Sequence, residues 1–176
     1  MSRLHHHYDD LIEIRYATPE DAEDIHEITH DAFEIYAQSL GQPDKVAALK
    51  ETPKDVVRDI SNKHVIIGTF VSKPAGSIRF DILPGNIAYI SRFGVRPEFQ
   101  KYGMGKALIQ FVHARCRELG LNAIVLHTGA KVFQLVRFYY GMGYYVHSTT
   151  TDRGYIRAFL VHELQPEYDL SAAMEK

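Results

Sequence analysis

A glycine-containing turn ahead of a long helical pattern is the segment of this sequence best suited to bind a ligand. It lies within Arg96–Lys106, where Gly103 and Gly105 allow the backbone to turn tightly. The first amides of a helix have no intrahelical partner, and together with the helix dipole they attract anions. Lys101 and Lys106 add positive charge. These residues predict a site for a phosphate or pyrophosphate group.

Two well-known phosphate motifs do not fit this turn. The P-loop requires GxxxxGK[ST], which is absent from the sequence. The dinucleotide fingerprint requires a third glycine, but the segment that starts at Gly103 has Leu108 at that position. The spacing instead matches the pattern Q/R-x-x-G-x-G/A, here at Gln100–Gly105.

This motif follows a strand pattern and Arg96-Pro97, and it resembles the acetyl-coenzyme A motif of the GCN5-related N-acetyltransferases, the GNAT family. Further along the chain, Phe138–Tyr144 is similar to the family's FYxxxGF/Y segment, where a helix ends and the next strand begins. The order of elements also agrees, from about Ile12 to Leu164. The resemblance implies an enzyme that moves an acetyl group from acetyl-CoA to a primary amine by direct attack on the thioester.

The resemblance also implies which residues bind the co-substrate acetyl-CoA. In the family, the strand before the glycine turn separates from its neighbour and offers backbone groups to the pantetheine arm, while amides of the turn hold the pyrophosphate. These roles fall on Phe93, Gly94 and Val95 in the strand and on Gln100, Lys101, Tyr102, Gly103, Met104, Gly105 and Lys106 in the turn. The Val95 amide would stabilise the oxyanion of a tetrahedral intermediate.

Tyr139 matches the family tyrosine that lies near the thioester sulfur and protonates the departing thiolate. A phenol with a pKa of about 10 is protonated at neutral pH and can act as a general acid. The alternative is a core tyrosine on an amphipathic helix. Two departures from the family pattern leave the base unassigned: Val132 stands where many members have asparagine, and Ile90–Phe93 contains no glutamate.

His127, at the end of a predicted strand, is the candidate base because imidazole titrates near neutral pH. The alternative is a strand-end histidine that bonds to the backbone, and Asp81 and Glu98 are weaker candidates. An ordered water that relays protons to solvent would make a dedicated base unnecessary.

Residues outside the two motifs are the candidates for binding the acceptor. They are Phe33 and Tyr36 near the end of the first helix, Arg92 on the strand and Arg153 in a late turn. Both arginines could bind a carboxylate on the acceptor through paired hydrogen bonds, or be ordinary surface arginines. A small-molecule amine is the favoured acceptor. The alternatives are a protein lysine or N-terminus, or a non-catalytic module that binds acyl-CoA.

Hydrophobic periodicity predicts the elements that position these residues. We expect strands at 11–16, 64–71, 75–83, 87–95, 122–127, 144–148 and 155–164, and helices after Thr18-Pro19, after Thr52-Pro53, at 103–119 and at 131–140. Ser72-Lys73-Pro74 should form a hairpin turn, and His113 should lie on the exposed face of the third helix.

The alternation of these elements predicts a mixed sheet covered by helices. The resemblance refines this to the α/β (α+β mixed) acyltransferase fold: a mostly antiparallel sheet with a splayed parallel strand pair and about four flanking helices. We expect a flexible N-terminus at 1–10, one acetyltransferase domain at 11–165 and a C-terminal tail at 166–176.

Composition excludes several classes of partner. The chain has 176 residues, with 20 Lys plus Arg against 22 Asp plus Glu, so it lacks the basic excess typical of nucleic-acid binding. No segment reads as a membrane span or a signal peptide. With one cysteine, Cys116, the sequence predicts a cytoplasmic protein without disulfides. His5–His7 is more typical of an exposed terminus or a cloning remnant than of a metal site. A homodimer is possible from the sequence.

Overall fold

The computed structural model describes residues 10–176, so the predictions for His5–His7 and for nearly all of the 1–10 segment lie outside the described residues. The elements, with η for a 3₁₀ turn, are β1 (Ile12–Tyr16), η1 (Pro19–Asp21), α2 (Ala22–Leu40), η2 (Pro43–Lys45), η3 (Ala47–Lys50), α3 (Pro53–Asn62), β2 (His64–Phe70), β3 (Lys73–Leu83), β4 (Ile87–Val95), η4 (Pro97–Tyr102), α4 (Met104–Glu118), β5 (Ala123–Gly129), α5 (Phe133–Gly141), β6 (Tyr145–Thr150), β7 (Arg157–Glu163) and α6 (Ser171–Met174).

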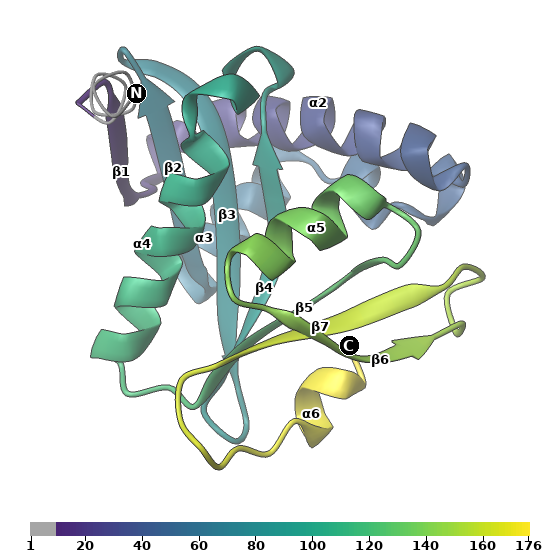
Figure 1. Cartoon of the computed structure of the whole chain (residues 1–176). Helices are drawn as coiled ribbons and strands as arrows, with labels where there is room; N and C mark the ends of the chain where they lie inside the picture. The colour runs from purple at the N-terminus through teal and green to yellow at the C-terminus, as the bar shows by residue number, and fades with distance from the viewer. Residues whose placement is uncertain (1–9) are drawn as a thin grey trace, which may run out of the picture.

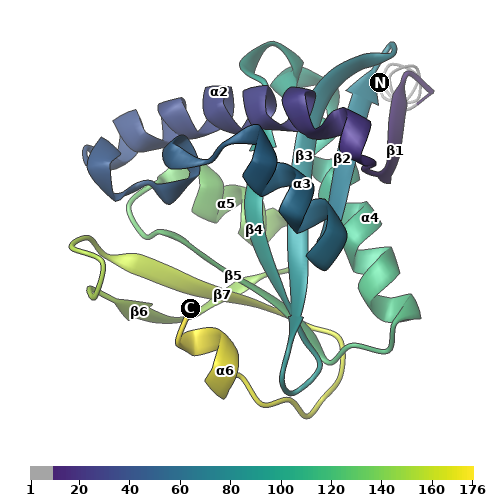
Figure 2. The same ribbon diagram turned by 180° about the vertical axis from the view of Figure 1, so that it is seen from behind.

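A seven-stranded sheet in the order β1-β2-β3-β4-β5-β7-β6 forms the middle layer. All neighbouring strands are antiparallel except β4 and β5. The helices α4 and α5 cover one face of the sheet (Figure 1), and α2 and α3 cover the other (Figure 2). The predicted mixed, mostly antiparallel sheet with flanking helices is confirmed.

Alternating side chains explain why both faces of the sheet are covered. Along β2, Ile66 belongs to the core beneath α4, whereas its neighbours Val65 and Ile67 pack with Ile25 and Val56 from α2 and α3. Successive residues of a strand point to opposite faces, so an unbroken apolar run must be buried on both sides. The run of isoleucine and valine in β2 therefore requires helices on both faces of the sheet.

The two Thr-Pro signals start helices as predicted. The Thr52 amide donates to Asp55 Oδ2 at 2.9 Å, and the Asp55 amide donates to Thr52 Oγ1 at 3.4 Å, so α3 begins with a reciprocal cap. The Thr18 amide likewise donates to Asp21 Oδ2 at 2.8 Å. Here the proline opens the short turn η1, and the regular helix α2 starts only after it.

Two local predictions are wrong at their boundaries. The hairpin between β2 and β3 turns at Val71 and Ser72, with φ values of 49° and 64°, rather than at Ser72-Lys73-Pro74. Two consecutive positive φ values are typical of the tight turn that suits strand twist. The segment 166–176, expected as a tail, contains α6. Its Leu170 and Ala173 are buried in a cluster with side chains from β3, β4, β5 and β7.

His113 is a third correction, because it is buried and not on an exposed face of α4. Its Nε2 lies 2.9 Å from the Tyr144 hydroxyl, and its ring stacks on His162 with centroids 4.2 Å apart. Burial, and then the nearby His162, lower the pKa of His113 to about 4. The helical pattern showed only that the position was polar, whereas its partners come from elsewhere in the chain: His162 on β7 and Tyr144 just before β6.

Candidate active site

The parallel pair β4–β5 separates partway along its length and leaves a gap in the sheet. The two strands pair only over Ile87–Tyr89 and Ala123–Val125, although β4 continues to Val95 and β5 to Gly129. Beyond this point β5 stays with β7, and the two halves of the sheet diverge (Figure 1). A cavity of about 630 Å³ opens there, lined by β4, β5, α2, α5 and the start of α4. The predicted splayed pair is confirmed.

An extra residue in β4 distorts the strand beside this gap. Ser77 and Arg79 of β3 pair with Gly94 and Ser91 of β4, so three steps along β4 match two along β3. Arg92 takes up the difference with a φ of 50°, a conformation that residues other than glycine seldom adopt. The bulge changes the direction of the side chains between the first part of β4, which pairs with β5, and the part after Arg92, which faces the gap.

Above the bulge, backbone groups of β4 point toward the gap and not toward a neighbouring strand. The Arg96 amide donates to the Ala75 carbonyl of β3 at 2.8 Å. Because amides alternate in direction along a strand, the Val95 amide points away from β3 and toward the gap. The Val95 carbonyl on the same side accepts from Gln100 Nε2 at 3.3 Å. The strand predicted to offer backbone groups therefore does face the cavity.

The start of α4 forms another wall. Gly103 has a φ of 83°, which glycine adopts without strain, and an added side chain there would meet nothing within 4 Å. The first bond within α4 runs from the Ala107 amide to the Gly103 carbonyl at 3.0 Å, so the amides of Met104, Gly105 and Lys106 precede it and have no intrahelical acceptor.

The side chains of the glycine turn go to different places. Gln100, Gly103, Gly105 and Lys106 line the cavity. The Met104 side chain is fully buried in the core, and the Tyr102 ring stacks on Phe70 with centroids 4.5 Å apart. Lys101 is exposed and, like Tyr102 and Met104, is outside the cavity lining. Any role of Tyr102 and Met104 at the site must therefore involve their backbone, because their side chains pack elsewhere.

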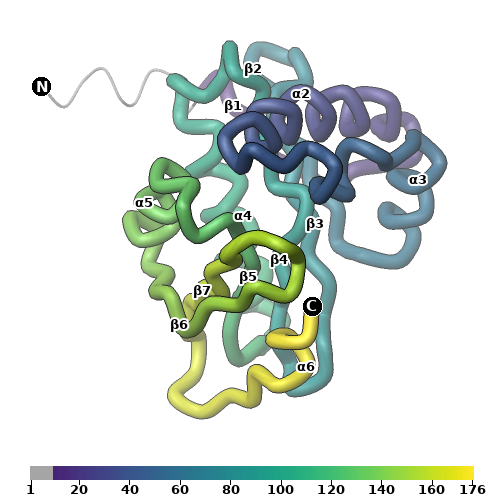
Figure 3. Tube along the Cα trace, turned by 90° about the vertical axis from the view of Figure 1, so that its right-hand side faces the viewer, coloured from purple at the N-terminus to yellow at the C-terminus, as the bar shows by residue number. Residues whose placement is uncertain are grey.

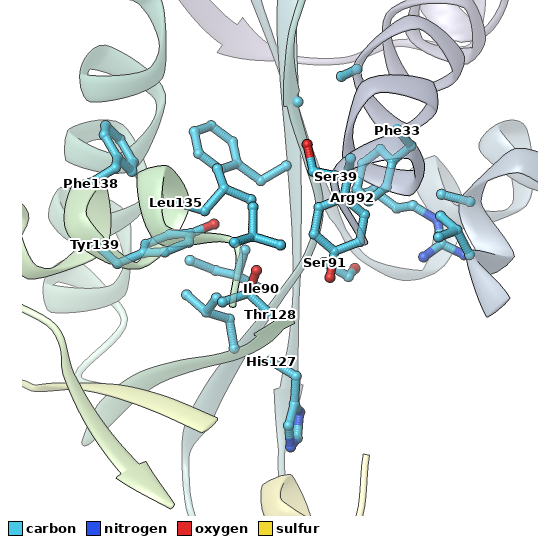
Figure 4. Close-up of a pocket in the computed structure, with 18 of the residues that line it drawn as sticks. Phe33, Ser39, Ile90, Ser91, Arg92, His127, Thr128, Leu135, Phe138 and Tyr139 are labelled. Carbon is cyan, nitrogen blue, oxygen red and sulfur yellow. The ribbon is translucent and has the colours of Figure 1, made fainter. Parts of the chain in front are cut away.

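Tyr139 projects from α5 into the cavity, with its hydroxyl toward the open side of β4 (Figure 4). The residue is 4% exposed, and its ring packs against Phe93, Phe138 and Tyr144. Burial raises the pKa of Tyr139 well above its usual value, and the nearby Tyr36 raises it further. The phenol therefore keeps its proton at neutral pH.

His127 and Tyr139 line the same cavity but do not point toward one another (Figure 4). His127 Nδ1 lies 2.7 Å from the Tyr89 hydroxyl, and the buried Nε2 has no hydrogen-bond partner. Burial, and then the charge of Arg157, lower the pKa of His127 to about 4. The ring is neutral at physiological pH. Asp81 and Glu98 do not line the cavity.

The predicted acceptor residues all line the cavity. The Tyr36 hydroxyl accepts from the Gly129 amide at 2.9 Å and so ties α2 to the end of β5. Burial raises the pKa of Tyr36 to about 12. Phe33 lies one turn earlier, with its ring centroid 5.8 Å from that of Tyr36. Together these two rings form an aromatic wall from α2.

Arg92 is held by a buried charge network. Its Nε lies 3.4 Å from Glu51 Oε1, and Glu51 also receives two hydrogen bonds from the fully buried Arg79, at 2.6 and 2.8 Å. Arg79 in turn donates to Asp59 at 2.8 Å. Breaking such a buried pair typically costs about 3–5 kcal/mol of stability. The network fixes Arg92 beside the cavity.

The structure adds residues that sequence reasoning missed, above all Tyr89, Lys45 and Arg157. All three line the cavity. Arg153, predicted from the late turn, shares Asp152 with Arg157, at 3.7 Å and 3.5 Å. One signal for Arg157 was available, since it is an arginine at the start of a strongly apolar strand pattern.

The sequence matches the acetyltransferase (GNAT) family over residues 22–144, which is well over half of the chain. The chain belongs to this family. Its match spans both the glycine turn and Tyr139, so the GNAT resemblance expected from the two motifs is confirmed. No curated protein matches the sequence.

Solved GNAT structures share the fold at low sequence identity. The PaiA N-acetyltransferase of Thermoplasma acidophilum, in complex with coenzyme A, is 19% identical, with 86% of this chain and 98% of that chain covered and a TM-score of 0.76. YncA of Salmonella typhimurium, a putative acetyltransferase with its cofactor acetyl-CoA, is 16% identical, with 89% of this chain and 96% of that chain covered and a TM-score of 0.70. The ribosomal-protein-S18-alanine N-acetyltransferase of Escherichia coli is 14% identical, with 89% of this chain and 96% of that chain covered and a TM-score of 0.66.

Two further observations concern residues 10–176 of this GNAT protein. No helix in this range is both long and apolar enough to cross a membrane. Nor does the range contain a group of three or more His, Cys, Asp or Glu side chains arranged to hold a metal ion.

Proposed function

We propose that this protein transfers the acetyl group of acetyl-CoA to a small-molecule primary amine. The observation that carries the proposal is the splayed β4–β5 pair, whose free backbone groups face the same cavity as the Tyr139 hydroxyl. A thioester in this gap would meet backbone donors on one side and a phenol on the other. Membership of the GNAT family supports the same reaction.

The residues around the gap suit acetyl-CoA. The amides that open α4 and the Lys106 side chain provide an anion site for its pyrophosphate. The open backbone of β4 at Phe93, Gly94 and Val95 suits the amide-rich pantetheine arm, which can pair with a strand edge. The coenzyme A in PaiA and the acetyl-CoA in YncA support this assignment by their fold.

In the reaction, the acceptor nitrogen forms a bond to the thioester carbonyl carbon, and the carbon–sulfur bond breaks. The Val95 amide stabilises negative charge on the carbonyl oxygen. Tyr139, which keeps its proton at neutral pH because burial raises its pKa, gives this proton to the leaving sulfur and regains one from solvent. His127 Nε2, neutral and without a partner, is the proposed acceptor for the proton that the amine loses, directly or through water.

The shape of the acceptor end favours a small amine over a protein chain. The turn between β6 and β7 lies next to the loop after α2 (Figure 3), and Gln42 Nε2 donates to the Gly154 carbonyl at 3.2 Å. This bridge between two segments beside the cavity favours a small acceptor over an extended peptide. A protein lysine or N-terminus remains the alternative acceptor, and a larger opening of this turn would favour it.

The test is release of free thiol from acetyl-CoA in the presence of a panel of small amines and amine-bearing peptides. We expect turnover with at least one small amine and none above background with peptides. Binding of CoA without turnover for any amine would support a non-catalytic acyl-CoA-binding module instead. Mass spectrometry of the product identifies the acetylated nitrogen.

Two properties of the whole protein complete the proposal. We propose a cytoplasmic location, which the single buried Cys116 supports, because this thiol has no cysteine partner in the sequence. A homodimer is the oligomeric state to test, by size-exclusion chromatography with light scattering. Fractionation of cells tests the location.

A further inference from the structure

The half of the cavity formed by β5, β7 and the loop after α2 is lined by basic side chains. Lys45, Arg153 and Arg157 contribute to it, and Arg92 of β4, paired with Glu51, lines the cavity as well. Within residues 10–176, no Asp or Glu side chain lines the cavity. A site for a polycationic acceptor would need carboxylates, because like charges repel strongly where water is excluded. The charge of this lining therefore selects for an acceptor that brings negative charge.

Arg157 is the most deeply buried of these basic residues that line the cavity. It is 7% exposed, and its Nε has no hydrogen-bond partner. Among the described residues its one ion-pair partner is Asp152, whose side chain is 56% exposed and is shared with Arg153. Asp152 is thus shared by two guanidinium groups, and Arg153 has a further acceptor in the Lys176 backbone oxygen at 2.6 Å, whereas Arg157 has none besides Asp152 in the part of the chain that the structure describes. Arg157 therefore keeps positive charge at the cavity wall, with one buried donor, Nε, that is unused.

A second unused polar atom lies in the same half of the cavity. His127 Nε2 is buried without a partner. The charges of Arg157, Arg153 and Arg92 all act on the adjacent Tyr89 hydroxyl, where they oppose the rise in its pKa caused by burial. Tyr89 and His127 therefore share the positive field of Arg157 and Arg153. Buried polar atoms without partners cost free energy, which a suitable ligand recovers by bonding to them.

We propose that the acceptor is a small primary amine that also carries an oxyanion, either a carboxylate or a phosphate, and that Arg157 binds this group. The inference rests on the function proposed above and names the class of its substrate. A guanidinium binds both oxyanions through short, charge-assisted hydrogen bonds, often in pairs. Arg153 and Lys45 add attraction from the rim, close to the turn at Gly154.

Binding of an oxyanion would also change the environment of His127. The Arg157 charge is the largest contribution after burial to the low pKa of this imidazole, with Arg153 acting the same way and Asp152 opposing it. A negative group on Arg157 offsets that effect. His127 then accepts a proton more readily once the correct acceptor is in place, which couples recognition of the acceptor to catalysis.

The experiment compares amines that differ only in charge. Thiol release from acetyl-CoA is measured for β-alanine against β-alaninamide and for O-phosphoethanolamine against ethanolamine, with spermidine as a cationic acceptor. We expect kcat/KM to be higher by about tenfold or more for the anionic member of at least one pair. The pair with the larger ratio distinguishes carboxylate from phosphate. Equal or higher kcat/KM for the neutral or cationic amines overturns the inference.

A matched pair of variants tests Arg157 itself. Arg157→Gln should lower kcat/KM for the anionic acceptor by about 10–100-fold and for its neutral partner by less than about threefold. Arg58→Gln, which removes an exposed arginine of α3, should change neither value. Loss of the same size for both acceptors would refute the assigned role. If Arg157→Gln does not fold, Arg153→Gln and the wild-type charge ratio still test the inference.

The outcomes separate this inference from the proposed function. CoA affinity, measured by calorimetry, shows that each variant keeps the co-substrate site. Thiol release with neutral amines alone would contradict the oxyanion inference and leave the acetyltransferase proposal intact. Absence of turnover with every amine, while CoA still binds, would remove the proposed function itself.

Discussion

The two ends of the cavity differ in their polar groups, which belong to the backbone at one end and to side chains at the other. The end formed by the upper part of β4 and the start of α4 uses backbone: the Val95 amide directed to the gap and the free amides around Gly103 and Gly105. The opposite end uses side chains, with Arg157 and His127 as its buried polar groups. Backbone groups suit a co-substrate that never changes, whereas side chains can be exchanged to suit different acceptors. Specificity should therefore reside in the charged end.

Tyr139 lies between the two ends, and its substitution should have the largest effect. Tyr139→Phe keeps the ring and its packing but removes the proton donor. We expect kcat to fall by about 100-fold while the Kd for CoA changes less than about threefold. Tyr140→Phe, at the exposed neighbour, is the matched control and should leave both unchanged. An unaltered kcat in Tyr139→Phe would remove this residue from the role of acid.

The backbone-built end can be tested with two glycines of equal strain. Gly103 and Gly120, at opposite ends of α4, have φ values of 83° and 69°, and an added Cβ would meet nothing within 4 Å at either. Valine at either position costs about 1–2 kcal/mol of stability. Only Gly103→Val should also raise the Kd for CoA, by about tenfold, as measured by calorimetry. Equal CoA affinity in the two variants would contradict the assignment of the anion site to this turn.

The same contrast explains what could be predicted from sequence. A backbone site depends on local conformation, so the glycines at 103 and 105 and the preceding strand pattern indicated it directly. The charged end joins segments far apart in the chain: Gln42 contacts Gly154 across 112 positions, and Arg157 lies opposite Gly129. No periodicity encodes such contacts. Arg92 was predicted as a candidate, but its network with Glu51 and Arg79 requires the fold.

The pH dependence of the reaction tests the charged end. Because the pKa of His127 is about 4 in the free protein, kcat/KM should show no inflection near pH 6.5 and should rise as the acceptor ammonium loses its proton. The groups that act on the imidazole are Arg157, Asp152 and Arg153. Profiles of wild type and His127→Gln, recorded from pH 5 to 9, check this. An inflection near pH 6.5 that His127→Gln abolishes would show a charged imidazole in the free enzyme.

The last expected effect concerns two histidines with lowered pKa values: His113, buried on α4 away from the cavity lining, and the half-buried His127 at the charged end. Both pKa values are about 4 in the folded protein, below the usual value of 6.5. Between these values the unfolded chain binds more protons, so stability falls as pH decreases from about 7 toward 4. The drop in Tm between pH 7.5 and pH 5 should shrink by about 4–8 °C in His113→Asn, for about 2 kcal/mol.

The control for this measurement is His147→Asn, because His147 is exposed on β6 and its loss should leave the drop in Tm unchanged. His113→Asn also removes the bond to Tyr144, so its Tm is lower at pH 7.5 as well, and the comparison must be made between pH values within each variant. An equal drop in wild type and His113→Asn would show that His113 is not held neutral. The same comparison made with His127→Asn would then test whether His127, at the charged end of the cavity, is held neutral.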